Sequence, residues 1–401
     1  MSRSLSRQQF AVLIVGLMAT GIGQSLVFAI LPPLGREVAL SELQITSIIA
    51  VSALVFAIAS PSWGRLSDRV GRKPIIVTGL LGYMVGTIMF TSVFYAGLSG
   101  VLSGLTLYGV LLLTRCSQAI IMSGTSPASA AYAADHSSPD QRTKTMARLG
   151  TANSMGMILG PAVSGALATL GLLAPLYFAG ILAAFAAILI WRKLPTTPKP
   201  ELVSREVKVR VRFSDPRVVR FLGAAIGLFL GYSGIQQTLG FQLQDKMQLS
   251  GIETAQMTGA ALMIAAVFTF ITQVTVMQRL KLAATQFIRL GMASLLIGAL
   301  FIVFFDRFAV LAVGMSFLGT GLGMCVPAIS AGASLAVNPD EQGAIAGMVS
   351  SCPAIGFTIG PICSGGLYQL YGQPAALFSV AAFVAVLVTL MIVERKHAVK
   401  Q

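Results

Sequence analysis

One arginine, Arg115, lies inside a long apolar segment, in the stretch "LLLTRCSQAIIMSG" that covers residues 111–124. Gln118 and Met122 follow it at helical spacing, so on a helix all three lie on one face. A guanidinium away from water offers a permanent charge and a planar set of donors, which suits an anionic or polar ligand. We therefore expect these three residues to line a binding site. The alternative is that Arg115 extends along its helix to a polar boundary and only anchors it there.

Carboxylates are missing from the interior of the apolar segments. The chain has 14 aspartates and glutamates, and each lies between two apolar segments or at the end of one. Because no carboxylate accompanies it, Arg115 favours anionic, zwitterionic or neutral amphipathic ligands over cations.

Signals for catalysis and metal binding are also missing from the sequence. Both histidines, His136 and His397, lie outside the apolar segments, and the four cysteines lack the short paired spacings of zinc or redox sites. No G-x-x-x-x-G-K-[ST] segment for nucleotide phosphates is present. We expect no enzymatic activity, no cofactor and no bound metal.

The elements that must position these residues are membrane-spanning helices. Mean hydropathy is +0.81, 55% of the 401 residues are hydrophobic and only 10% are charged. About 20 consecutive apolar residues cross a bilayer once. The net charge of +14 could suggest nucleic acid, but the basic residues occupy short loops and form no continuous face. We therefore expect a multi-pass membrane protein that contacts lipids and binds no nucleic acid.

Twelve apolar segments are long enough to cross the membrane, which predicts an all-α fold. Their expected bounds are 9–33, 43–64, 74–95, 99–133, 144–171, 173–194, 218–243, 254–277, 283–305, 308–337, 342–370 and 374–393. The one long polar stretch separates six helices from six. It predicts an N-terminal six-helix bundle over residues 1–194, a basic linker over 195–217 and a C-terminal six-helix bundle over 218–401.

The lysines and arginines predict the orientation, because cytoplasmic loops carry the excess of them. With the N-terminus in the cytoplasm, nearly all of the 28 basic residues fall in cytoplasmic loops and tails. The opposite side holds Arg36, Lys246 and Arg307. We expect a protein of the plasma (inner) membrane with both termini in the cytoplasm.

The two halves of the sequence share a pattern at an offset of 200 residues. In the predicted fifth and eleventh helices the matching positions are Gly156 with Gly356, Gly160 with Gly360, Pro161 with Pro361 and Gly165 with Gly365. An offset of six helices preserves direction across the membrane, so the halves are parallel repeats, as in transporters. Glycines let helices approach closely and proline removes a backbone hydrogen bond, so we expect a bend or pivot there, with simple packing as the alternative.

Three stretches resemble motifs of the major facilitator superfamily, and the resemblance spans the whole chain. "GRLSDRVGRKP" at 64–74 resembles the signature loop between the second and third helices, through Gly64, Asp68, Arg69, Gly71, Arg72 and Lys73. The segment around Arg115 resembles the fourth-helix motif, although Ala119 stands where glycine is usual. "GMILGPAVSG" at 156–165 resembles the fifth-helix motif of the 12-helix drug/proton antiporter group.

The resemblance implies alternating access, with the signature loop and the matched glycines and prolines as gating residues. In the family, the residue equivalent to Asp68 faces the start of the eleventh helix, near Glu341 to Gly343 here, and holds the outward-open state. The alternative is that the charges of this loop only fix the orientation of the chain.

Further candidates for substrate contact lie in the helices expected to line the cavity. They are Gln24 and Phe28 in the first helix, and Tyr232, Gln236, Gln237 and Phe241 in the seventh. Each glutamine could instead bond a neighbouring helix, and each phenylalanine could belong to the core.

The expected function is secondary active transport of small organic molecules by a monomer, most simply multidrug-type export in exchange for protons. An exporter or importer of an anionic metabolite, such as a siderophore or an organic acid, is the alternative. A membrane scaffold or receptor is a more distant one, because it would not require gating motifs in both halves.

Overall fold

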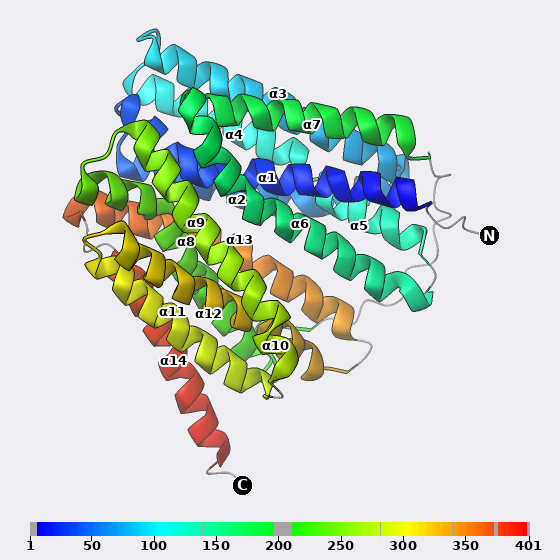
Figure 1. Ribbon diagram of the computed structural model, residues 1–401. Coiled ribbons are helices and arrows are strands. Elements are labelled where there is room, and N and C mark those ends of the chain that lie inside the picture. The colour runs from blue at the N-terminus through cyan, green and yellow to red at the C-terminus, as the bar shows by residue number, and fades with distance from the viewer. Residues whose placement is uncertain are drawn as a thin grey trace. The chain divides into compact units, whose positions relative to one another are not determined.

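The protein is all-α in the part of the chain that the structure describes. The computed structural model describes residues 6–137, 139–195, 211–280, 282–338, 341–372 and 376–398, and these form fourteen α-helices and one 3-10 turn without any strand (Figure 1). The predicted fold class is thereby confirmed. Residues 196–210 of the predicted linker lie outside the described residues, as do Pro339 and Asp340, which precede the predicted eleventh helix.

The first half of the chain contains seven helices. They are α1 (Arg7–Glu37), α2 (Glu42–Val70), α3 (Arg72–Leu98), α4 (Gly104–Met122), α5 (Thr125–Asp135), α6 (Pro139–Leu167) and α7 (Ala174–Lys193), with the turn η1 (Ala168–Leu170) after α6. The second half contains the other seven. They are α8 (Val219–Met247), α9 (Gly251–Val274), α10 (Val276–Arg279), α11 (Ala284–Phe304), α12 (Phe308–Leu335), α13 (Gln342–Tyr371) and α14 (Leu377–Ala398).

Helices of the structure cover all twelve predicted segments. Within the described residues, ten helical stretches are long and apolar enough to cross a membrane, with α4 and α5 counted as one and α9 and α10 as another. The apolar part of α14, Leu377–Ile392, is shorter, and α6 is long but begins with a charged segment. Two predicted single helices, 99–133 and 254–277, each prove to be divided, the first between α4 and α5 and the second between α9 and α10.

Contacts divide the chain into two compact units. The first comprises residues 1–44, 51–204 and 250–260, and the second comprises residues 45–50, 205–249 and 261–401. A short part of α2 therefore packs within the second unit, and the beginning of α9 packs within the first.

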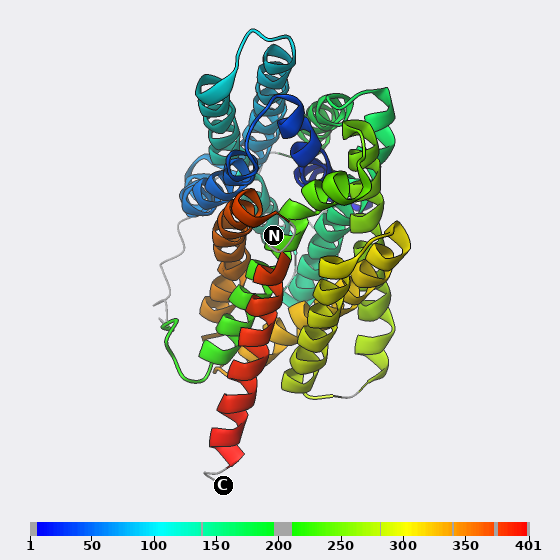
Figure 2. The ribbon, with the colours of Figure 1, turned by 90° about the vertical axis from the view of Figure 1, so that its left-hand side faces the viewer.

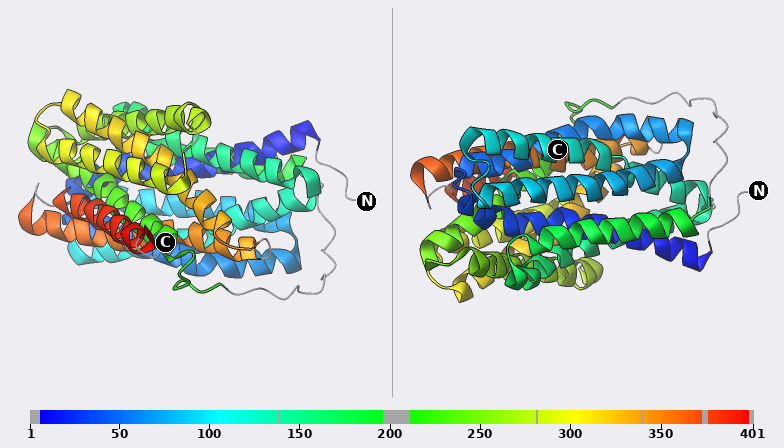
Figure 3. Two further views of the ribbon diagram at one scale, coloured as in Figure 1. Left: turned by 90° about the horizontal axis from the view of Figure 1, so that it is seen from below. Right: turned by 90° about the horizontal axis from the view of Figure 1, so that it is seen from above.

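In the first unit, α1 packs against α6 and α7, and α3 packs against α4 and α7 (Figure 3). Its largest fully buried side chains include Tyr83, Phe90 and Phe94, all on α3. In the second unit, α8 packs against α13 and α14, and α11 lies beside α12 (Figure 2). Phe241, Phe305 and Phe383 are fully buried there. Each unit therefore has its own apolar core.

Local sequence explains where the first helices begin and end. The hydroxyls of Ser6 and Ser41 each accept a hydrogen bond from the backbone N–H of the glutamine three residues on. The side-chain oxygen of that glutamine accepts in turn from the backbone N–H of the serine, which makes a capping box at the starts of α1 and α2. Gly71 joins α2 to α3 with φ of 100°, a conformation that side-chain-bearing residues rarely adopt. Gly71 of the signature loop is thus required by the turn.

Candidate functional site

The structure brings Arg115 and Gln118 together inside the first unit. Nη1 of Arg115 donates a hydrogen bond of 2.5 Å to Oε1 of Gln118. The amide nitrogen of Gln118 donates in turn to Oγ1 of Thr87 at 2.6 Å and to the carbonyl of Tyr83 at 3.2 Å. The guanidinium is therefore held by a chain of hydrogen bonds that ends on the backbone of α3.

Arg115 is buried without a counter-charge among the described residues. Only 8% of its surface is exposed, its Nε has no hydrogen-bond partner, and its guanidinium lies 5.7 Å from the ring centre of Phe90. Inserting an arginine into the membrane costs about 2.5–3.5 kcal/mol on insertion scales. A buried arginine that is kept at this cost is therefore a candidate for a functional role. The arrangement can accept an anionic or strongly polar group at the unpaired donor.

Three residues of this cluster, Tyr83, Thr87 and Phe90, were not predicted from the sequence. They follow one another at intervals of four and three residues, so they share one face of α3. Gly86 on the same helix makes room for Gln118, since an added Cβ would lie 2.5 Å from Gln118 Cβ. The signal available in the sequence was the polar pair Tyr83 and Thr87 at helical spacing, with Gly86 beside them, which indicates a polar face on this helix.

Gln24 and Phe28 occupy α1 in the same unit. Phe28 is buried, with 8% of its surface exposed, whereas Gln24 is partly exposed and makes no hydrogen bond to any described residue. The expectation that these two residues contact substrate therefore remains a proposal. Met122 is buried at the last position of α4.

The helix that carries Arg115 is divided at Ser123 and Gly124, between α4 and α5. Pro127, three residues further, has no N–H to donate to the preceding turn. The backbone N–H of Gly124 bonds the carbonyl of Ile121 instead of that of Ile120. The carbonyl of Ile120 accepts instead from the indole N–H of Trp63, at 2.6 Å, and from the hydroxyl of Ser123, at 2.8 Å. Trp63 thus ties α2 to the division.

In the second unit, the predicted site residues lie along α8. Gln236 and Gln237 are 5% and 1% exposed, and Oε1 of the first and Nε2 of the second have no hydrogen-bond partner. Tyr232 is partly exposed on the preceding turn. Phe241 is fully buried, with its ring 5.6 Å from that of Tyr368. Both glutamines retain polar atoms for a ligand, whereas Phe241 lies within the packing of the unit.

The glycine pattern makes equivalent contacts in the two units. Ser25 of α1 donates to the carbonyl of Gly156 at 3.4 Å, and Ser233 of α8 donates to the carbonyl of Gly356 at 2.9 Å. A Cβ on Gly160 would lie 2.6 Å from the carbonyl oxygen of Ile22, and a Cβ on Gly360 would lie 2.7 Å from that of Leu230. The repeat seen in the sequence is therefore also a repeat of helix contacts.

The other matched positions also lie in close contacts. A Cβ on Gly165 would lie 3.3 Å from the backbone of Gln256 at the start of α9. Pro161 lies within α6 and Pro361 within α13, and both helices continue through the proline.

The signature loop is organised around Arg72. Its guanidinium pairs with Asp68, bonds the hydroxyl of Ser67 at 2.7 Å and bonds Asp135 at 3.1 Å. Lys73 donates to the carbonyl of Leu194 at 2.6 Å. In the first unit, therefore, the charges of the loop connect α2 and α3 to the ends of α5 and α7.

Comparison with known families decides what this chain is. The model of the Major Facilitator Superfamily matches residues 13–352. The chain belongs to the Major Facilitator Superfamily. As a member of this superfamily of transporters, with its many apolar helices, it is a multi-pass membrane protein that carries small molecules.

Relatives within the superfamily cover almost the whole chain. Multidrug resistance protein 2 of Bacillus subtilis is 26% identical over 390 residues, which is 92% of each chain. Quinolone resistance protein NorA of Staphylococcus aureus is 24% identical over 404 residues, which is 98% of each chain. A crystal structure of the human organic anion transporter MFSD10 superimposes with a TM-score of 0.67 at 20% identity, over 96% of this chain and 99% of that one.

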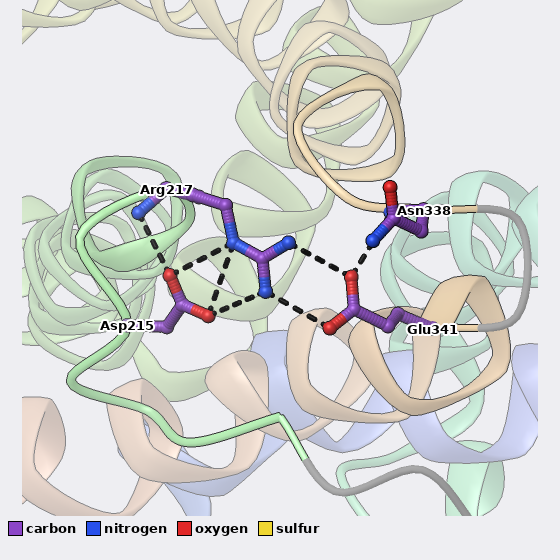
Figure 4. A network of polar contacts seen from close by, with 4 residues as sticks. All are labelled: Asp215, Arg217, Asn338 and Glu341. Carbon is purple, nitrogen blue, oxygen red and sulfur yellow. Dashed lines mark hydrogen bonds and ion pairs between the residues drawn. The ribbon is translucent and has the colours of Figure 1, made fainter.

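One ion-pair cluster of this superfamily member was not predicted. Arg217 binds Asp215 and Glu341 simultaneously, at 2.8 and 2.9 Å, and the backbone N–H of Asn338 donates to Glu341 at 3.0 Å (Figure 4). These hydrogen bonds hold the pKa of Asp215 and that of Glu341 below their usual range, and they raise the pKa of Arg217. The cluster joins the segment before α8 to the start of α13.

We expect Arg217→Gln to release this segment. Hydrogen exchange at residues 211–218 and 341–345 should become faster, because both carboxylates lose their shared cation. Arg212→Gln removes the same charge at an exposed position and serves as the control.

Because the pKa values of Asp215 and Glu341 are depressed in the folded protein, the contribution of the cluster to stability is present at neutral pH and lost as pH falls below about 4. Unchanged exchange in Arg217→Gln would show that the cluster restrains nothing.

Proposed function

We propose that this chain is a multidrug-type exporter that exchanges small amphipathic organic molecules for protons by alternating access. The observation that carries the proposal is the similarity, over nearly the whole length, to a multidrug resistance protein and a quinolone resistance protein. The excess of lysine and arginine supports an orientation with both termini in the cytoplasm of a plasma (inner) membrane. We further propose that it works as a monomer.

The buried guanidinium supports a second candidate, which is transport of an anionic metabolite. Arg115 lies deep in its apolar segment, whereas each acidic residue that the structure describes lies in a loop or near a helix end. Gln236 and Gln237 offer polar atoms without charge. Such groups suit neutral, zwitterionic or anionic substrates better than cations, so the two candidates differ in the charge of the substrate.

Uptake into inside-out membrane vesicles tests both candidates. Cationic, neutral and anionic compounds are compared with and without an imposed pH gradient. Uptake of several amphipathic compounds that depends on the gradient is the expected result for the multidrug exporter. Uptake restricted to anions would support the second candidate, and uptake of none would contradict transport in this direction.

For the gate, we propose that Asp68 stabilises the outward-open state, and that the other signature-loop residues and the glycine-proline pairs participate in the transition. Asp68→Asn should then shift the population towards the inward-open state and slow transport without unfolding the protein, because a two-state equilibrium responds to a few kcal/mol. Spin labels at the cytoplasmic ends of α2 and α13 measure the shift. Arg72→Gln tests whether the effect arises instead from the pair within the first unit, since it breaks that pair and keeps Asp68. An unchanged distance distribution in Asp68→Asn would exclude the gating role.

A further inference from the structure

We propose that a groove between α2 and α4 binds one acyl chain of an anionic phospholipid, whose phosphate is held by Arg65 and Arg69. The inference rests on the proposed orientation, which places these arginines at the cytoplasmic face of the membrane. It concerns a lipid site that is separate from Arg115 and from the glycine contacts.

The groove is apolar and large enough for part of a lipid. Its volume is about 480 Å³, within the range of roughly 300–1,000 Å³ that is typical of ligand pockets. Its apolar lining consists of Val55, Ile58, Ala59, Trp63, Leu66 and Ile120. Ile58 is 69% exposed and Ile120 is 44% exposed, so the groove is open along its length.

The groove contains few polar groups, which favours an apolar occupant. The indole N–H of Trp63 is bonded to the carbonyl of Ile120 at 2.6 Å. Ser62 is the one hydroxyl in the lining, and it accepts a hydrogen bond of 3.3 Å from Nη2 of Arg65. The interior of the groove thus offers hydrocarbon and aromatic surface, and its single polar contact leads to a cation.

Two exposed arginines stand at the charged end of α2, where the groove ends. Arg65 reaches the groove through Ser62, and Arg69 lies one helical turn further along α2. Within the described residues no carboxylate pairs with either, since Asp68 pairs with Arg72. A guanidinium pair beside an apolar groove is complementary to a lipid that has a phosphate and an acyl chain.

A smaller cavity in the second unit lacks this combination. It has a volume of about 140 Å³ and is lined by three serines, Ser330, Ser334 and Ser350, together with Ile345, Ala346 and Val349. No basic residue belongs to its lining. This cavity is therefore not expected to bind an anionic phospholipid.

The two tryptophans of the chain, Trp63 and Trp191, provide the test. The variant Trp191→Phe keeps only Trp63, which lines the groove. The variant Trp63→Phe keeps only Trp191, which is 65% exposed on α7 and reports on lipid elsewhere. The full chain is placed in nanodiscs of zwitterionic lipid that contain a small fraction of brominated phosphatidylglycerol or brominated phosphatidylcholine. Bromine on the acyl chain quenches tryptophan fluorescence on contact.

Brominated phosphatidylglycerol should quench Trp63 more strongly than brominated phosphatidylcholine, and Trp191 should show no such preference. Arg65→Gln should lower the preference about fivefold, as expected for one arginine at a charged surface. Arg192→Gln, an equal change of charge beside Trp191, should leave it unchanged. Ala59→Phe should fill the groove and reduce quenching by both lipids.

Equal quenching of Trp63 by the two lipids would overturn the proposal. The same preference for brominated phosphatidylglycerol at Trp191 as at Trp63 would also overturn it, because it would indicate a general enrichment of anionic lipid around the protein. Lack of effect of Arg65→Gln would exclude the phosphate contact. The readout requires no transport, so failure of the lipid site is distinguishable from failure of the exporter function.

Discussion

Arg115→Ala is expected to lower the affinity for an anionic substrate at least tenfold, about 1.4 kcal/mol, and to abolish its transport. The substitution removes the charge that Gln118, Thr87 and the backbone of Tyr83 hold in place. Arg115→Lys keeps a positive charge but loses the planar donors, so part of the affinity should remain. A cationic substrate should bind the alanine variant as well as the wild type or better.

Binding and transport have to be measured on the same purified, monodisperse protein, with one anionic and one cationic compound. Gln118→Glu is an informative companion, because it introduces a carboxylate beside Arg115 with almost no change of shape. It should reduce anion affinity in the same direction as Arg115→Ala while leaving the guanidinium in place. If Arg115→Ala transports every compound at the wild-type rate, the residue is an anchor and the site assignment is wrong.

Gly160→Leu and Gly360→Leu should each reduce turnover more than they reduce the amount of folded protein. The added side chain collides with α1 in one case and with α8 in the other, where Ser25 and Ser233 lie against the glycines. Close approach of these helices is needed in at least one state of the cycle, so the barrier between states rises. Initial transport rates, normalised to folded protein, provide the measurement.

Each helix also offers a matched control. Gly150 on α6 and Gly347 on α13 have open space where a Cβ would lie, so leucine at either position should be tolerated. Poor accumulation and aggregation of Gly160→Leu and Gly360→Leu, with normal controls, would identify the two glycines as packing positions without a role in gating.

Much of this architecture was predictable because a membrane restricts the chain to apolar helices and charged loops. The hydrophobic runs located the passes, and the helical spacing of Arg115 and Gln118 correctly placed them on one face. Partners on another helix could not be found in this way. The spacing of Tyr83 and Thr87 indicates a polar face on α3, but that this face meets Gln118 is seen only when α3 is packed against α4.

The ion pairs at the helix ends were hidden for a different reason. Arg217 and Glu341 are 124 positions apart, and nothing in either segment indicates that they meet. The division between α4 and α5 had a visible cause in Gly124 and Pro127, but the apolar run through it was continuous. Beside it, Trp63 bonds the carbonyl of Ile120, a contact between α2 and α4 that exists only in the folded unit.

The division in the fourth pass has a mechanical consequence. Pro127 has a counterpart in Pro327, yet α12 runs without interruption from Phe308 to Leu335. A glycine precedes Pro127 by three residues, whereas Met324 stands at the matching place in α12. We therefore expect the fourth pass to bend more readily than the tenth, at the point between the segment with Arg115 and the segment next to the signature loop.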